Sequence, residues 1–213
     1  MGVTLKLATS LDGRIATASG ESRWITGAPA RLTVHHLRAA HDAVVIGIGT
    51  ALADDPELSV RLEGFDGPQP ARVVLDSRQR LPATSRLASG GGAPTYVVTT
   101  GEPAQGLLSI GVRLLRVAAG EDGRVDPAAA VKALAAEGLG RLFVEGGGEV
   151  AASFLRAGLV DRIEWFRAPI VLGGEGRAAV GPLGRHALAD ATRWRRLAVE
   201  TVGEDLWERY ERI

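Results

Sequence analysis

Short apolar runs recur along the chain at the spacing expected of buried strands. Residues 3–9 are β-rich and partly alternating, and Ser10-Leu11-Asp12-Gly13 supplies a turn, after which we expect a hairpin or a loop. Residues 43–48 form a continuous run rich in valine and isoleucine, which is typical of a central parallel strand covered on both faces. We predict further strands at residues 72–75, 95–99, 112–117, 142–144 and 162–172, and a C-terminal hairpin of residues 195–202 and 206–213.

Helix starts are marked by proline in the first turn and by capping residues. Pro29, after Thr26 or Gly27, predicts a helix that runs to about residue 40. Asp126-Pro127 predicts a second helix that runs towards residue 138, and a third helix follows three consecutive glycines. Because strands and helices alternate, the pattern predicts an α/β fold with an antiparallel edge at the C-terminus, and we expect one domain over residues 1–213.

The segment from Glu145 into the third helix has the sequence of a glycine turn between a strand and a helix. Three glycines let the backbone turn sharply and approach a ligand, and the N–H groups that open a helix favour bound phosphate. The alternative is a plain tight connection. Gly146, Gly148 and Ala151 fit the loose dinucleotide pattern G-x-G-x-x-A, but several strands precede this turn and no acidic residue is clearly placed about 20 positions further on. A standard dinucleotide fold is therefore not expected.

Composition narrows the class of protein. With 213 residues, 46% of them hydrophobic and 23% charged, the chain is an ordinary globular protein. Lys+Arg and Asp+Glu both number 25, so nothing favours nucleic acid or a membrane surface as a partner. The N-terminus lacks a signal-peptide core, and no apolar run approaches membrane-spanning length. We expect a cytoplasmic protein.

The absence of cysteine excludes several kinds of chemistry. Disulfides, thiolate nucleophiles and cysteine metal sites are ruled out, as is the zinc signature of nucleobase deaminases, H-x-E with P-C-x-x-C. The histidines lack acidic or cysteine partners at ligand spacing, so we predict no metal site and place them on helix surface and in loops. They are His35, His36, His41 and His186.

Four blocks of sequence, residues 6–16, 20–26, 49–56 and 144–147, together carry a family resemblance. They resemble the reductase domain of the bacterial bifunctional riboflavin-biosynthesis deaminase/reductase, over nearly the whole chain. The resemblance implies a fold like that of dihydrofolate reductase, with a mainly parallel central sheet, flanking helices, and NADPH across the carboxyl ends of the strands. It also implies reduction of the ribosyl group of 5-amino-6-(5-phosphoribosylamino)uracil to a ribityl chain, by hydride from the nicotinamide and without a metal.

The resemblance also implies which residues contact NADPH. They are Ala8, Trp24, Thr50, Asp54 and Ser77, with Gly147, Gly148, Glu149, Val150, Ala151, Ala152 and Ser153 of the glycine turn. Arg78 follows a strand and suits a 2′-phosphate, because a fixed guanidinium gives paired hydrogen bonds to phosphate; the alternative is a solvated arginine. Trp24 is alternatively a packed loop aromatic, and Asp54 an ordinary turn or cap. Glu149 in the first turn of the helix would repel a pyrophosphate unless it points away.

For the substrate, the matched positions are Ser22, Arg38, Leu58, Arg61 and Glu145. Arg38 and Arg61 are candidates for clamping the 5′-phosphate, although a lone arginine on a helix is usually solvated. Glu145 would accept hydrogen bonds from the amino and ring N–H groups of the pyrimidine. Lys6 is the candidate for polarising the sugar oxygen or assisting ring opening, and the alternative for a strand lysine is an exposed edge position. Lys6 and Glu145 are thus the candidate catalytic residues.

Two other functions remain in view. The chain is alternatively a reductase of a related substrate, such as the non-deaminated diaminopyrimidine or a pterin, or a non-catalytic NADPH-binding protein. The family's habit implies a homodimer. Because the chain carries no deaminase signature, a separate deaminase is a candidate partner.

Overall fold

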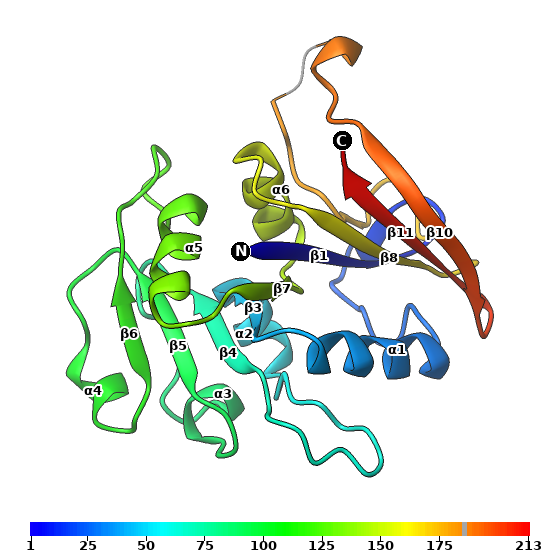
Figure 1. The fold of residues 1–213 in the computed structure, drawn as a ribbon. Coiled ribbons are helices and arrows are strands. Elements are labelled where there is room, and N and C mark those ends of the chain that lie inside the picture. The colour runs from blue at the N-terminus through cyan, green and yellow to red at the C-terminus, as the bar shows by residue number, and fades with distance from the viewer. Residues whose placement is uncertain (185–186) are drawn as a thin grey trace. The chain divides into compact units, whose positions relative to one another are not determined.

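The computed structural model describes residues 1–184 and 187–213, which divide into two compact units (Figure 1). The first unit comprises Met1 and His35–Gly146, and the second comprises Gly2–Val34 and Gly147–Ile213. Helix α1 (Ala28–Ala39) contributes to both, and its bounds agree with the helix predicted after Pro29.

The first unit is built on five strands that pair only in parallel. Their order is β7 (Arg141–Val144), β3 (Ala43–Gly47), β4 (Ala71–Leu75), β5 (Thr95–Thr99) and β6 (Arg113–Arg116). Strand β3 is buried along its whole length, as its continuous apolar run predicted. The strands predicted near residues 72, 95, 112 and 142 are confirmed within about two residues at their ends.

Four helices belong to the first unit: α2 (Ile48–Asp54), α3 (Arg86–Ser89), α4 (Gln105–Leu108) and α5 (Pro127–Ala136). Helix α5 begins as predicted, because the Asp126 side chain accepts hydrogen bonds from the N–H groups of Ala128 and Ala129. Helix α2 was not predicted. It begins at Ile48, so strand β3 ends at Gly47, one residue before the predicted end of that strand. The helix stops where Asp55, its C-cap residue, takes a left-handed conformation (φ 39°) and Pro56 follows.

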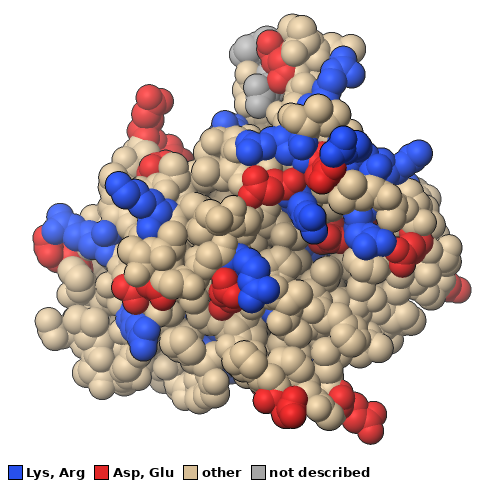
Figure 2. Space-filling view, viewed as in Figure 1, with Lys and Arg blue, Asp and Glu red and all other residues tan. Residues whose placement is uncertain are grey.

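The second unit contains strands β10 (Trp194–Val202), β11 (Asp205–Arg212), β8 (Arg162–Arg167) and β1 (Gly2–Thr9), in this order. Strands β1 and β8 are parallel, whereas β8, β11 and β10 are successively antiparallel. The predicted C-terminal hairpin is therefore confirmed. Figure 2 shows basic and acidic side chains side by side over this hairpin, where Arg195 pairs with Glu211 and Arg209 with Glu200 across the strands.

Strand β8 is shorter than the predicted run of residues 162–172. Its ladder ends where the Ala168 N–H donates to the Thr9 carbonyl at 2.8 Å, because Pro169 has no N–H to continue it. The Asp12 carboxylate then accepts the N–H groups of Leu172 at 3.1 Å and Gly173 at 2.8 Å. A hydrogen bond from Ser10, followed by the one from Leu172, lowers the pKa of Asp12 to about 2. These bonds hold residues 170–173 as a loop.

The remaining elements of the second unit are short. Strand β2 (Arg14–Ala16) pairs with β9 (Arg177–Ala178), so a loop, not a hairpin, follows β1. Helix α6 (Gly148–Arg156) starts at the glycine turn, and a 3-10 turn, η1, spans Leu188–Asp190. Within the described parts of the chain, no helix is long and apolar enough to cross a membrane.

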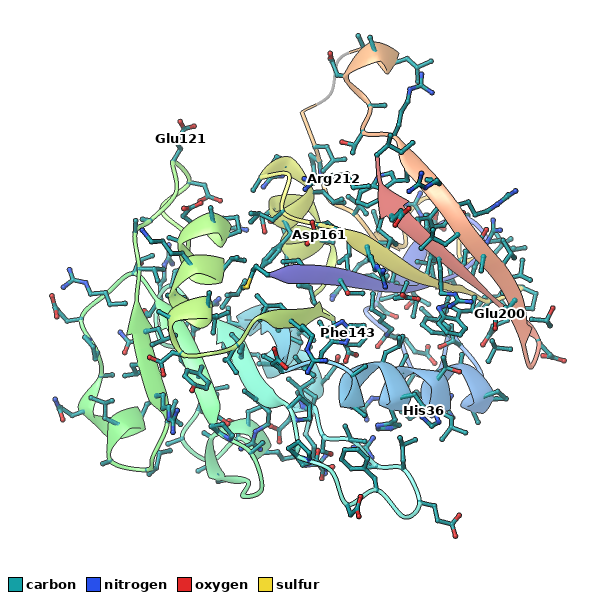
Figure 3. All side chains as sticks on the ribbon, viewed as in Figure 1. His36, Glu121, Phe143, Asp161, Glu200 and Arg212 are labelled. Atoms are coloured by element: carbon teal, nitrogen blue, oxygen red, sulfur yellow. The ribbon has the colours of Figure 1, made fainter. Side chains whose placement is uncertain are left out.

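Indole groups satisfy two buried polar side chains of the second unit. Trp165 donates to the Thr9 hydroxyl at 2.8 Å, and Trp207 donates to the Glu164 carboxylate at 2.7 Å. Burial raises the pKa of Glu164, although the bond from Trp207 and the charge of Arg209 act in the opposite direction. Near the chain ends, Arg212 pairs with Asp161 at 3.4 Å, and both side chains are labelled in Figure 3.

Candidate functional site

The carboxyl edge of the parallel strands in the first unit gathers polar groups. Glu145 follows β7, helix α2 follows β3, residues 76–78 follow β4, and Thr99 ends β5. Since all these strands run in one direction, their carboxyl ends lie at one edge, which is where open α/β sheets bind ligands. This edge carries most of the residues that the sequence assigned to ligands in this unit.

Arg38 and Glu145 form a bidentate ion pair at this edge. The Arg38 Nε atom lies 2.6 Å from Glu145 Oε1, and Nη2 lies 3.0 Å from Oε2. The exposed fractions of the two side chains are only 12% and 9%. The third nitrogen, Nη1, donates to the Ser59 carbonyl at 3.0 Å, so the guanidinium joins helix α1, the end of β7 and the loop after α2. A phosphate clamp formed by Arg38 would have to break these bonds.

The pair fixes the charge of both partners. Burial acts to lower the pKa of Arg38, but the charge of Glu145 and the hydrogen bonds to it prevail and raise that pKa above its ordinary value. A buried carboxylate that accepts two bonds from a permanent cation stays ionised and keeps its orientation. Glu145 is thus held as an oriented hydrogen-bond acceptor.

The loop after helix α2 carries the other predicted substrate residues of this unit. Leu58 is buried with φ 55°, a left-handed conformation that turns the chain back towards α1. Arg61 is exposed and donates to Glu57 Oε2 at 2.9 Å, while the other Glu57 oxygen accepts from Arg86. The hydrogen bond from Arg61 is the main cause that lowers the pKa of Glu57. Arg61 therefore has a defined position with its guanidinium at the surface.

The described histidines lie on helix α1 and in the bend after it, in agreement with the predicted helix and loop positions. His35 Nδ1 accepts the Arg61 backbone N–H at 3.2 Å, and burial, followed by the charges of Arg38 and Arg61, lowers the pKa of His35. The His41 Nδ1 atom lies 2.6 Å from the Leu37 carbonyl oxygen, and its ring packs 4.9 Å from that of Phe143. His35 lies on α1 and His41 in the bend that follows it, and both rings are half-buried.

His36, labelled in Figure 3, is exposed on α1 as predicted, and His186 lies outside the described residues. In the described chain, no group of three or more His, Cys, Asp or Glu side chains is arranged to hold a metal ion.

The turn after β4 is firmly anchored around Ser77. The Ser77 hydroxyl accepts the Val125 N–H at 2.9 Å, and its carbonyl accepts from the hydroxyls of Thr99 at 3.2 Å and Thr100 at 3.1 Å. Arg78 is exposed, and among the described residues no hydrogen bond or ion pair engages its guanidinium. An exposed guanidinium on a fixed turn fits a phosphate monoester. The other two cofactor candidates of this unit, Thr50 and Asp54, are half-buried on α2.

The second unit carries the remaining predicted residues. Lys6 and Ala8 are half-buried on one face of β1, because residues two apart on a strand share a face. Ser22 is half-buried and Trp24 is 69% exposed in the loop before α1, so Trp24 is not a packed core aromatic. The Arg31 guanidinium lies 4.3 Å from the centre of the Trp24 ring, in a cation–π contact.

The glycine turn has a packing role that the sequence offered only as its alternative. A Cβ atom on Gly148 would lie 2.5 Å from the Ala178 carbonyl oxygen, and the Gly148 carbonyl accepts the Gly181 N–H at 2.9 Å. Gly147 caps α6, whose first N–H groups lack helical partners and so suit an anion. Ala151 and Ala152 are buried in the core, whereas Glu149 is exposed in the first turn.

Sequence reasoning missed two residues that organise this region, His35 and Glu57. Both contact Arg61. Helical spacing offered a signal for His35, since a residue three positions before Arg38 lies on the same face of a helix. Glu57 and Arg61 are likewise four residues apart, but they lie in a loop, where spacing predicts nothing.

A parallel sheet with polar groups at its carboxyl edge, followed along the chain by an antiparallel hairpin, is the arrangement of the dihydrofolate-reductase-like class of α/β proteins. Residues 2–207 match the RibD C-terminal domain family, and the chain belongs to that family. It is similar to the riboflavin biosynthesis protein RibD of Aquifex aeolicus, with 36% identity over 96% of this chain and 56% of that protein. The chain spans about half the length of the curated RibD relatives it matches.

Other relatives extend the comparison. The chain is 39% identical to the 2,5-diamino-6-ribosylamino-4(3H)-pyrimidinone 5′-phosphate reductase of Methanothermobacter thermautotrophicus, over 98% of this chain and 96% of that protein. The solved structure of Acinetobacter baumannii RibD matches with a TM-score of 0.86 and 34% identity, covering 100% of this chain and 58% of that one. These likenesses confirm the predicted fold class.

Proposed function

We propose that this chain is an NADPH-dependent reductase of riboflavin biosynthesis that converts 5-amino-6-(5-phosphoribosylamino)uracil to its ribityl product. The observation that carries the proposal is the buried Arg38–Glu145 pair, which holds an ionised acceptor at the carboxyl edge of the parallel strands. Glu145 would accept the amino and ring N–H groups of the pyrimidine. Arg61, exposed and fixed by Glu57, would bind the 5′-phosphate, and Ser22 and Leu58 would complete the substrate contacts.

The reaction consumes one hydride and one proton. NADPH, when bound, supplies the hydride to the former anomeric carbon. Before that transfer the bond from this carbon to the ring oxygen breaks, the glycosidic nitrogen forms a C=N bond, and the ring oxygen takes the proton. A half-buried strand lysine can supply that proton, so we assign this role to Lys6. Hydride addition to the C=N bond then leaves the secondary amine of the ribityl product.

Each unit carries residues that suit one part of NADPH. The anchored turn of Ser77 and Arg78 suits the 2′-phosphate, and the opening turn of α6 suits a pyrophosphate. Ala151 and Ala152 can contribute only through their backbone, since their side chains are buried. The family resemblance further supports contacts from Ala8, Trp24, Thr50 and Asp54, a single reductase domain, a cytoplasmic homodimer, and a separate deaminase that supplies the substrate.

A second substrate deserves equal testing, because the Methanothermobacter thermautotrophicus reductase is matched over 96% of its length. Its name specifies the diamino compound. Loss of absorbance at the nicotinamide band, measured with each pyrimidine, separates the two. Oxidation of NADPH only with the deaminated compound supports the proposal, and oxidation only with the diamino compound replaces it. Cofactor binding without turnover on either compound would mean a non-catalytic NADPH-binding protein.

Replacing Arg78 by alanine should raise the KM for NADPH by about 10- to 100-fold, the effect of losing a charge-assisted hydrogen bond to phosphate. The KM for NADH should not change, because NADH has no 2′-phosphate. Steady-state kinetics with both cofactors measures this difference. Arg80→Ala is the matched control. Arg80 lies two residues after Arg78, but its Nε atom lies 4.0 Å from Oδ1 of the buried Asp76. Equal effects of the two substitutions would remove Arg78 from the 2′-phosphate site.

A further inference from the structure

Helix α1 presents a histidine to the loop that carries Arg61. His35 lies one helical turn before Arg38, so the two side chains share a face of the helix. The Nδ1 atom of His35 accepts the backbone N–H of Arg61 at 3.2 Å. We propose that His35 is a positioning residue, whose neutral imidazole fixes the backbone from which Arg61 reaches the substrate phosphate. The inference rests on the proposed function, which makes Arg61 a substrate contact.

The hydrogen bond specifies the tautomer of the ring. Since Nδ1 accepts, the proton of the neutral imidazole lies on Nε2. Protonation of Nδ1 would place two donors face to face, and the bond to Arg61 would be lost.

The surroundings keep the ring neutral. The charged groups that act on it are Arg38 on α1, Arg61 in the loop and Glu145 at the end of β7. Burial is the main cause that lowers the pKa of His35, and the two arginines add to it. A hydrogen bond with the Ser59 backbone and the charge of Glu145 act in the opposite direction without reversing the shift.

The contact matters because Arg61 otherwise depends on side-chain bonds at the surface. Its side chain is 58% exposed, and its guanidinium pairs with Glu57. Neighbouring residues of the loop have their own hydrogen bonds. The Ser59 carbonyl accepts from Arg38, and the Val60 backbone makes two bonds with the Gln69 amide, at 2.7 and 3.0 Å. The bond from the Arg61 N–H to His35 acts on the backbone of Arg61 itself. His35 also bonds the Ser59 backbone, but Ser59 keeps its bond from Arg38, so loss of the imidazole should misplace the Arg61 guanidinium more than the rest of the loop.

The test compares His35→Ala, His35→Asn and His35→Gln, with His36→Ala as the control on the exposed side of the same helix. His35→Ala should raise the KM for the phosphorylated pyrimidine by about 3- to 10-fold, as expected for one neutral hydrogen bond. Turnover number and the KM for NADPH should not change. Asparagine places its oxygen where Nδ1 lies and should restore the KM to within about twofold, whereas glutamine should not. An unchanged KM in His35→Ala, or equal values for asparagine and glutamine, would overturn the proposal.

The pH dependence supplies a second readout. The KM of the wild type should rise more steeply than that of His35→Asn as the pH falls below 6.5, the ordinary pKa of histidine. The titration of the substrate phosphate, with a second pKa of about 6, is common to both proteins and cancels in the comparison. Parallel profiles would show that protonation of His35 does not affect substrate binding.

A third readout does not depend on activity. Nitrogen NMR should show His35 with an unprotonated Nδ1 at pH 7, and the Arg61 amide hydrogen should exchange at least about threefold faster in His35→Ala. If the wild type reduces no pyrimidine, the proposed function fails, while these measurements still decide whether His35 holds Arg61. A protonated Nδ1 would refute the positioning role even in an active enzyme.

Discussion

Replacing Glu145 by alanine is expected to destabilise the protein by about 3–5 kcal/mol and to abolish reduction of the pyrimidine. The substitution leaves Arg38, whose side chain is only 12% exposed, without its counter-charge. A loss of about 3–5 kcal/mol is typical when one partner of a buried ion pair is removed. Urea denaturation measures the stability, and NADPH oxidation under saturating substrate measures the activity.

Two further variants separate stability from function at this pair. Arg38→Met combined with Glu145→Leu removes both charges, so it should recover most of the lost stability without any activity. Glu145→Gln keeps the shape and one acceptor oxygen but loses the charge, and its kcat/KM should fall by at least about tenfold. A Glu145→Gln enzyme with wild-type kcat/KM would show that an ionised acceptor is not required.

The second large effect is expected at the glycine turn. Gly148→Ala would place a Cβ atom 2.5 Å from the Ala178 carbonyl oxygen, which is backbone and cannot move aside cheaply. We expect a destabilisation of at least about 1–3 kcal/mol, the usual cost of overpacking. In a chain of 213 residues, each kcal/mol lowers the melting temperature by about 2–4 °C.

The control for this prediction is Gly174→Ala, because the Cβ position of Gly174 is in open space. Its melting temperature should stay within about 1–2 °C of the wild type, since such surface substitutions cost less than about 0.5 kcal/mol. A Gly148→Ala protein with unchanged stability but a raised KM for NADPH would contradict the packing role and assign the glycine to phosphate binding alone.

The parts of the fold that could be predicted from sequence are those with a local cause. The apolar run of β3 and the Asp126-Pro127 cap act within a few residues, and both predictions are confirmed. Helix α2 was missed because its sequence, Ile48 to Asp54, has no capping side chain and follows a glycine. The pairing of β2 with β9 was also beyond prediction, since it joins segments about 160 residues apart.

The candidate site also contains residues that could be predicted from sequence and contacts that could not. Family resemblance supplied Arg38, Glu145 and Arg61 one by one, but only the structure shows that Arg38 and Glu145, 107 positions apart, bind each other. A long-range ion pair leaves no periodic trace in one sequence. The role of His35 was overlooked for a related reason, because its partner is a backbone N–H group, and sequence patterns record side chains.

The hydrogen bonds that Asp12 accepts from Leu172 and Gly173 bear on how a pH profile of this protein is interpreted. Because the folded pKa of Asp12 is lowered to about 2, below its ordinary 3.8, its stabilising effect is complete above pH 3.8 and is lost only as the pH falls through about 2. The hydrogen bonds between Asp12 and the loop of residues 170–173 therefore remain intact throughout the pH range in which histidine and phosphate titrate. An inflection in activity between pH 5 and 7 would thus arise elsewhere than in this loop, and the titration of His35 can be followed without interference from it.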